Sequence, residues 1–91
     1  MSYRYKATHR FWKSFDRLSL AQKQAAWKAW DVFKRNPFDP RLRPHKIHRL
    51  SAEFGVTVHA VCIEGDLRAV FYVEGDIVWS VDIGTHAIYR G

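Results

Sequence analysis

The feature that most constrains this 91-residue chain is a tripeptide that occurs twice in its second half, Glu-Gly-Asp at 64–66 and again at 74–76. Glycine accepts the positive φ that tight turns require, so each tripeptide predicts a hairpin turn. Apolar and polar residues alternate on both sides of each turn, which is the period of a β-strand. The chain is therefore expected to form three consecutive antiparallel strands between Phe54 and Ile83.

The same alternation predicts which face of the sheet each side chain occupies. The apolar residues, expected to face the helices, are Phe54, Val56, Val58, Ala60, Cys62, Leu67, Ala69, Phe71, Val73, Ile77, Trp79, Val81 and Ile83. The opposite, polar face is expected to display Thr57, His59, Arg68, Tyr72, Ser80 and Asp82. A two-residue first loop places Tyr72 across from His59, and a three-residue second loop places Asp82 across from Arg68, close enough to pair.

The first half of the chain predicts a short edge strand and a helical hairpin. Tyr3 to Thr8 alternates like a strand, and Thr8 can cap a first helix that carries Phe11, Phe15 and Leu18 on one stripe. Ser19-Leu20-Ala21-Gln22 has the form of a capping box for a second helix, which Asn36-Pro37 ends. The buried face of that helix is expected to be Trp27, Trp30 and Phe33. These elements predict one α+β domain over residues 1–91, an N-terminal helical hairpin packed on a small, mainly antiparallel sheet.

Positive charge is concentrated in the first half of the chain. Residues 1–49 contain 13 Lys and Arg against three Asp, whereas residues 50–91 contain two Arg against six acidic residues. The densest basic segment is Arg41, Arg43, His45, Lys46, His48 and Arg49. This segment could contact a phosphate backbone, or it could be a solvated edge whose charge discourages aggregation. For the helices, the Lys and Arg residues need no role beyond solubility.

Several classes of function are disfavoured by the composition. Cys62 is the single cysteine, so it forms no internal disulfide, and its apolar neighbours predict a buried free thiol. The N-terminus has no apolar signal core and no stretch reaches transmembrane length, which leads us to expect a cytoplasmic protein without a membrane partner. His45 and His48 lack the further ligands that a zinc site needs, so we expect no metal and no cofactor.

The residues with the potential for chemistry gather around the polar face. His86 follows the third predicted strand and Tyr89 follows it closely, while Arg68 and His59 are expected on the same face. A histidine can transfer protons at neutral pH, and an arginine can stabilise a phosphorane. Together these groups are the parts that metal-free RNA cleavage needs, in which a ribose 2′-hydroxyl is the nucleophile.

Taken end to end, the chain resembles the RelE/ParE toxin superfamily of bacterial type II toxin–antitoxin systems. The resemblance lies in the helical hairpin followed by Asn36-Pro37, the His45-Lys46-Ile47 approach to the sheet, the strand Arg68-Ala69-Val70-Phe71-Tyr72, and the strand end Ile83-Gly84-Thr85-His86. The last of these is most similar to the YafQ-type branch of mRNA interferases. That branch tends to carry an arginine before Gly-Thr-His, where this chain has Asp82.

The resemblance implies a role for each candidate residue. Arg68 corresponds to the phosphate-binding arginine, His86 to a general acid or base, and Tyr89 to an aromatic or hydroxyl contributor. His59 and Thr57 occupy the strand from which the family points basic side chains into the site. His45 corresponds to a histidine at the approach to the sheet, and Lys46 and Arg49 would bind RNA.

The function implied by the resemblance is a ribosome-associated, metal-independent mRNA endonuclease. Its partners would be mRNA, the ribosome and a cognate antitoxin, and the chain would be a monomer that enters higher assemblies through that antitoxin. Two alternatives remain open. One is a ParE-like inhibitor of DNA gyrase, which needs no catalytic set, and the other is a non-catalytic protein-binding member of the fold.

Overall fold

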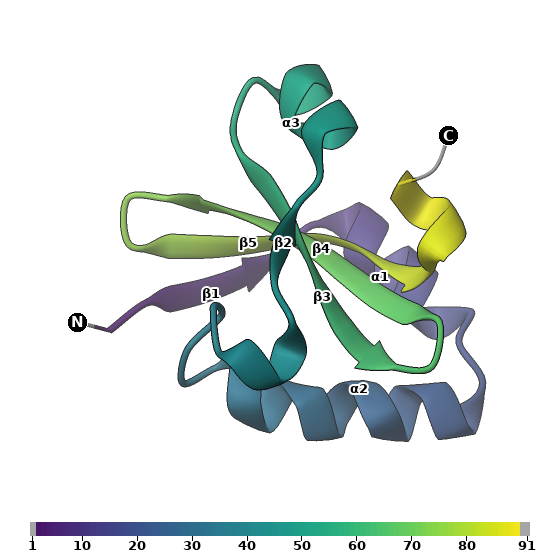
Figure 1. The fold of residues 1–91 in the computed structure, drawn as a ribbon. Helices are drawn as coiled ribbons and strands as arrows, with labels where there is room; N and C mark the ends of the chain where they lie inside the picture. Colours follow the sequence, from purple (N-terminus) through teal and green to yellow (C-terminus); the bar gives the residue numbers. More distant parts are fainter. Residues whose placement is uncertain (1, 90–91) are drawn as a thin grey trace.

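The molecule is a five-stranded sheet with helices on both faces (Figure 1). The computed structural model describes residues 2–89, with the backbone alone at residues 86 and 89. The elements in chain order are β1 (Arg4–Ala7), α1 (His9–Asp16), α2 (Leu20–Phe33), the 3₁₀ turn η1 (Pro40–Leu42), β2 (His45–Lys46), α3 (His48–Phe54), β3 (Val58–Glu64), β4 (Leu67–Glu74), β5 (Ile77–Thr85) and the 3₁₀ turn η2 (His86–Tyr89). The strand order is β1-β5-β4-β3-β2, and β1 is parallel to β5 whereas the other pairs are antiparallel. The predicted α+β class and the mainly antiparallel sheet are confirmed.

The helical hairpin begins at the residues that the sequence indicates. The Thr8 side chain accepts a hydrogen bond from Phe11 N at the start of α1. Ser19 and Gln22 form the expected capping box at the start of α2. The prediction that Trp27 is buried is wrong, because its exposed fraction is 53%. Trp27 and Phe33 are six residues apart, which puts them about 120° apart around an α-helix, and only Phe33 is directed at the sheet.

The two Glu-Gly-Asp tripeptides form two equal turns. Glu64 pairs with Leu67 and Glu74 pairs with Ile77, so both loops contain two residues, with Gly65 at φ +54° and Gly75 at φ +62°. The prediction of a three-residue second loop is therefore wrong.

The register that follows differs from the predicted one. Tyr72 lies opposite Val58 and not opposite His59, and Asp82 lies opposite Val70 and not opposite Arg68. The pairing also shifts at Ile63 in β3 and at Val81 in β5, where one extra residue reverses the alternation beyond it. The prediction assumed unbroken alternation along each strand, so it could not include the extra residues at Ile63 and Val81.

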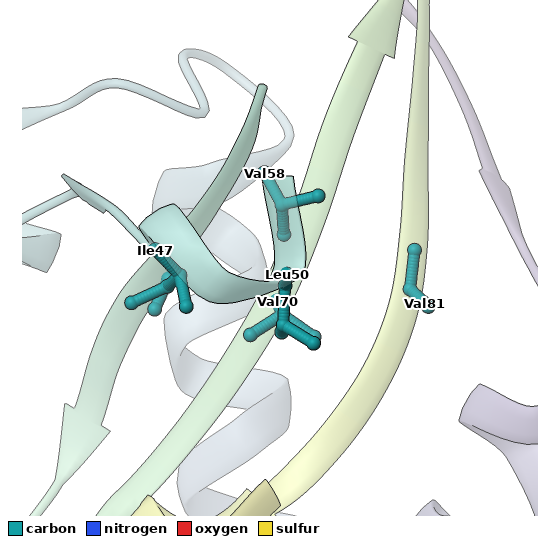
Figure 2. Packing of buried hydrophobic residues seen from close by; sticks show 6 residues of the cluster. Ile47, Leu50, Val58, Val70 and Val81 are labelled. Carbon is teal, nitrogen blue, oxygen red and sulfur yellow. The ribbon is translucent and has the colours of Figure 1, made fainter. Parts of the chain in front are cut away.

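The sheet is buried on both faces, in place of the predicted polar face. One core lies between the sheet and α2 and contains Phe33, Leu42, Val61, Phe71 and Val78. The second core lies on the opposite face and contains Ile47, Leu50, Val58, Ala60, Val70 and Val81 (Figure 2). Because each of the three long strands supplies apolar side chains to both faces, choosing one parity as the buried one misplaced several residues.

The helix α3 covers the second face and was not predicted. Phe54 and Val56 were expected in a strand, whereas Phe54 ends α3, Val56 lies in the loop that follows, and each is 37% exposed. Gly55, at φ +73°, caps the helix in the left-handed conformation that glycine adopts without strain. Ser51 Oγ accepts a hydrogen bond from Val58 N at 2.8 Å and so fastens α3 to β3.

The chain end folds back over the second face because residue 84 is glycine. A Cβ atom at position 84 would lie 2.7 Å from Cγ2 of Ile88, well inside van der Waals contact. Ile88 packs against the second core, and its close approach to Gly84 lets η2 lie over the end of β5. The glycine is therefore required by a packing contact, since its backbone conformation is open to any residue.

We predict that Gly84→Ala lowers the free energy of unfolding by about 1–3 kcal/mol, the usual cost of overpacking. Ile88→Ala removes the clashing atom, so the double variant should be less destabilised than the sum of the two single variants. Urea unfolding of the four proteins measures this coupling. Strict additivity would show that η2 does not rest on Gly84.

Candidate functional site

Arg68 lies beside the end of β5, in a row of residues that crosses three strands. It pairs with Cys62 of β3 on one side and with Gly84 of β5 on the other. The next pair along is Leu67 with Thr85, and η2 begins at residue 86. Residues two positions apart on one strand share a face, so Arg68 lies on the face of Val70, which α3 covers. Arg68 was expected opposite Asp82, and the structure instead places it opposite Gly84, two residues further along β5.

A small hollow at the β3–β4 turn brings Arg68 together with the basic loop. Its volume is about 170 Å³, and its lining is Arg41, Arg43, Cys62, Ile63, Glu64, Gly65 and Arg68. Arg68 Nη1 donates to the carbonyls of Gly65 at 2.8 Å and Leu67 at 3.2 Å. Cys62 is half-buried at this hollow, so the prediction of a buried thiol is wrong.

The charge of the hollow is only partly compensated. Arg41 donates from Nε and Nη2 to both carboxylate oxygens of Asp39, at 3.1 and 2.9 Å. These hydrogen bonds from Arg41 hold the pKa of Asp39 at about 2. Within residues 2–89, no carboxylate forms an ion pair with Arg43 or Arg68. Guanidinium groups without a carboxylate partner are suited to bind an anion such as phosphate.

The remaining predicted RNA-binding residues lie exposed along the neighbouring sheet edge. His45 and Lys46 form β2, where they pair with Ala60 and His59. His48 and Arg49 start α3, and their exposed side chains alternate with the buried Ile47 and Leu50. The apolar residues anchor the segment and hold its basic side chains at this edge, where Lys46 shares the face of its partner His59 and His45 shares that of Ala60.

His59 lies on the other face of the sheet from Arg68, which corrects the predicted shared face. Its ring stacks on Phe71 with centroids 5.6 Å apart and meets Phe38 edge to face at 5.1 Å. Nδ1 is buried and has no hydrogen-bond partner in the described part of the chain. Burial lowers the pKa of His59, and the charges of Lys46 and His45 lower it further.

Asp82 is paired with α1 and not with Arg68. Its carboxylate Oδ2 accepts a hydrogen bond from Arg10 Nε at 3.1 Å, and the residue is only 6% exposed. The predicted Asp82–Arg68 ion pair is therefore wrong, and Arg68 keeps its charge for another partner. Sequence reasoning gave Arg10 no role, because a contact between residues 72 positions apart leaves no local pattern.

The other two predicted catalytic side chains, those of His86 and Tyr89, lie outside the described residues. Their backbone forms η2 directly after β5. Thr57 lies in the loop that leads into β3, outside the strand in which it was expected. In residues 2–89, no group of three or more His, Cys, Asp or Glu side chains is arranged to hold a metal ion.

The α1/α2 face carries an apolar groove of about 360 Å³ that the sequence did not indicate. Trp12 and Trp27 line it with exposed fractions of 46% and 53%, and its floor includes Phe71 and Ile83 of the sheet. Exposed tryptophans beside an apolar hollow are typical of protein-binding surfaces. None of the helices in the described residues is long and apolar enough to cross a membrane.

Comparison of the sequence found no matching family model and no matching curated protein. Comparison of the structure found full-length matches. One is a chain of the archaeal RelE–RelB complex from Pyrococcus horikoshii, with a TM-score of 0.71, 15% identity and 100% of both chains covered. Another is YafQ from E. coli, with a TM-score of 0.70, 15% identity, and 99% of this chain and 100% of that chain covered.

A third match is a copper-bound mutant toxin from Helicobacter pylori, with a TM-score of 0.69, 20% identity, and 94% of this chain and 97% of that chain covered. This chain has the RelE/ParE toxin fold. At these identities the likeness establishes the fold and leaves the activity to be argued from the residues. A chain of the E. coli DinJ–YafQ toxin–antitoxin complex also matches, with a TM-score of 0.71, 15% identity and 100% of both chains covered.

We predict that replacing His59 by Phe changes how stability depends on pH. The folded protein keeps His59 neutral below its ordinary pKa of 6.5, while the unfolded chain takes up a proton there. Stability therefore falls as the pH drops below about 6.5. His59→Phe removes this loss and the unpaired Nδ1, so the variant should be about 1 kcal/mol more stable at pH 7.

Urea unfolding at pH 7 and pH 5 measures both effects. The difference in stability between the two pH values should be smaller in His59→Phe than in the wild type. An equal difference in the two proteins would mean that the His59 proton does not distinguish the folded from the unfolded chain.

Proposed function

We propose that this protein is the toxin of a type II toxin–antitoxin system and a ribosome-associated endoribonuclease that cleaves mRNA. The observation that carries the proposal is the register that puts Arg68 next to the Gly84-Thr85 strand end, within a fold shared over its full length with RelE and YafQ. Both parts are needed, because the fold alone hosts no chemistry and an arginine alone is a common surface residue.

The reaction requires a base, an acid and a cation. A base removes the proton of a ribose 2′-hydroxyl, and the oxygen attacks the adjacent phosphorus. The 5′-oxygen of the next nucleotide leaves and takes a proton from an acid, which gives a 2′,3′-cyclic phosphate. Arg68 stabilises the phosphorane, since charge grows on its oxygens in the transition state. His86 and Tyr89 are the family's candidates for proton transfer.

His59 is left out of this catalytic set, although the sequence analysis included it. Its ring is stacked among Phe71 and Phe38 on the α1/α2 face, away from Arg68. A half-buried histidine in aromatic packing is suited to a structural role. Arg43, His45 and Lys46, together with Arg41, His48 and Arg49, supply the positive surface that would hold the RNA strand or ribosomal RNA.

The partner that restrains the toxin is a protein with an acidic amphipathic helix, seated in the groove of the α1/α2 face. The groove supplies apolar area around Trp12 and Trp27, and its lining includes Lys6. The helices beside it contribute more cations than anions, namely Lys13, Lys23 and Lys28 against Asp16 and Asp31. Apolar and acidic faces on one helix would complement both features.

We predict that Arg68→Ala and His86→Ala each lower the rate of mRNA cleavage by about 100-fold or more, the range seen when one transition-state contact is removed. Growth arrest on induction and primer extension on translated mRNA measure the loss. Arg35→Ala is the control, because it removes an exposed arginine remote from the strand end. If both variants still arrest growth and DNA gyrase is poisoned, the proposed nuclease function is wrong and the protein is a gyrase inhibitor.

We predict that Trp27→Ala weakens antitoxin binding by about thirty-fold, the usual effect of truncating an interface tryptophan. The antitoxin encoded by an adjacent gene is titrated in a calorimeter. Leu20→Ala is a matched control, since Leu20 begins the same helix, is 73% exposed and lies outside the groove. Equal affinities for the two variants would place the antitoxin elsewhere.

A further inference from the structure

Asp82 is the one charged residue that is buried in the part of the chain described by the structure. Its Oδ1 accepts a hydrogen bond from the backbone N of Ile83 at 2.9 Å, and its Oδ2 accepts one from Arg10 Nε at 3.1 Å. Burying a carboxylate carries a desolvation cost that a single ion pair repays poorly, so the pair is a weak device for stability. What the buried carboxylate does well is to fix the guanidinium that it binds.

The local fold explains how a helix residue reaches this carboxylate. β1 ends at Ala7, opposite Ser80, so beyond that residue β5 is paired with β4 alone and has no strand on its other side. Thr8 Oγ1 donates to the carbonyl of Val81 at 3.0 Å and starts α1 at this uncovered edge. The extra residue at Val81 turns Asp82 to the face of Val70, and Arg10 in the first turn of α1 meets it there.

Most of the Arg10 guanidinium remains available. Only Nε takes part in the ion pair, and the side chain is 56% exposed while that of Asp82 is 8% exposed. Nη1 and Nη2 make no hydrogen bond or ion pair to another described residue. Their N–H groups form a planar fork, which matches two oxygens of a phosphate.

Asp82, which binds Arg10, lies on the same face of the sheet as Arg68. Asp82 pairs with Val70, and Arg68 pairs with Gly84, so the two sites are diagonal neighbours on adjacent strands. The Cα atoms of such diagonal positions, here Asp82 and Arg68, are about 7–8 Å apart. Gly84, over which η2 folds, lies directly opposite Arg68 and two residues after Asp82, and it faces the same way. One cation therefore lies on each side of the strand end that leads to His86.

We propose that Arg10 binds a backbone phosphate of the RNA next to the one held by Arg68, and that Asp82 is the positioning residue that holds Arg10 there. The inference rests on the proposed nuclease function and adds a helix residue to its binding surface. It also gives a role to Asp82, whose buried carboxylate holds a cation of α1 beside β5.

The test measures the affinity of the full chain for a single-stranded 2′-O-methyl RNA oligonucleotide, which lacks the attacking hydroxyl and cannot be cleaved, over a range of salt concentrations. Arg10→Ala should bind about ten-fold more weakly, and the slope of log affinity against log salt should fall by about 0.7, the value for one phosphate contact on a single strand. Arg17→Ala removes an exposed arginine from the other end of the same helix and should leave the slope unchanged.

The deciding variant is Arg10→Ala/Asp82→Asn, which has the same net charge as the wild type. Its amide can still accept from Ile83 N and leaves no unpaired buried charge, so its thermal midpoint should exceed that of Arg10→Ala. If Arg10 contacts a phosphate, the double variant binds the RNA as weakly as Arg10→Ala does. If its affinity and salt slope return to wild-type values, Arg10 is only a counter-ion and the inference is overturned.

Different results would contradict the nuclease function and the role of Arg10. A wild-type chain that neither binds this RNA nor cleaves translated mRNA contradicts the nuclease itself, and the inference with it. A wild type that binds and cleaves, beside an Arg10→Ala variant with an unchanged affinity and salt slope, contradicts the role of Arg10 alone.

Discussion

The pairing register of β3, β4 and β5 is the constraint on which the rest of the molecule depends. Two equal turns at Gly65 and Gly75 set that register, and two single-residue shifts, at Ile63 and Val81, modify it. Because side chains alternate between faces, each shift sends every later residue to the other side of the sheet. The shift at Val81 is what brings Asp82 to the α3 face, and the unshifted stretch before Ile63 puts His59 on the α1/α2 face.

The two buried faces of the sheet separate two kinds of surface. On the α1/α2 face, aromatic side chains from both helices pack on Phe71 and leave an apolar groove with Trp12 and Trp27 at its sides. On the opposite face, α3 and η2 cover the apolar centre, and cationic groups remain around it. A partner protein and a nucleic acid could therefore contact different sides of a chain of only 91 residues.

Charge on the α3 face is arranged by packing more than by pairing. Ile47 and Leu50 are buried while His48 and Arg49 between them are exposed, so the apolar anchors fix where the positive side chains stand. Arg41 and Arg10 each have a carboxylate partner, Asp39 and Asp82, and in both cases the acid orients the arginine. Arg43 and Arg68 form no ion pair in residues 2–89, and Glu64 also lines the hollow that they share with Arg41.

The sequence by itself determined the features whose causes are local. Thr8 and Ser19 start helices because their hydroxyls accept from nearby backbone N–H groups, and Gly65 and Gly75 make turns because they accept positive φ. These signals, with the alternation between them, were enough for the α+β class and for three consecutive antiparallel strands joined by hairpin turns.

Only the tertiary structure decided which face each side chain occupies. The strands are apolar on both faces, so periodicity cannot say which side is covered, and a one-residue shift leaves no mark in composition. His59 was therefore assigned to the wrong face, and the end of α3 was predicted as the beginning of a strand. The Arg10–Asp82 pair joins residues 72 positions apart, and its geometry comes from the end of β1, the cap of α1 and the shift at Val81 acting together. Such a contact depends on long-range packing, and the sequence around either residue gives no sign of it.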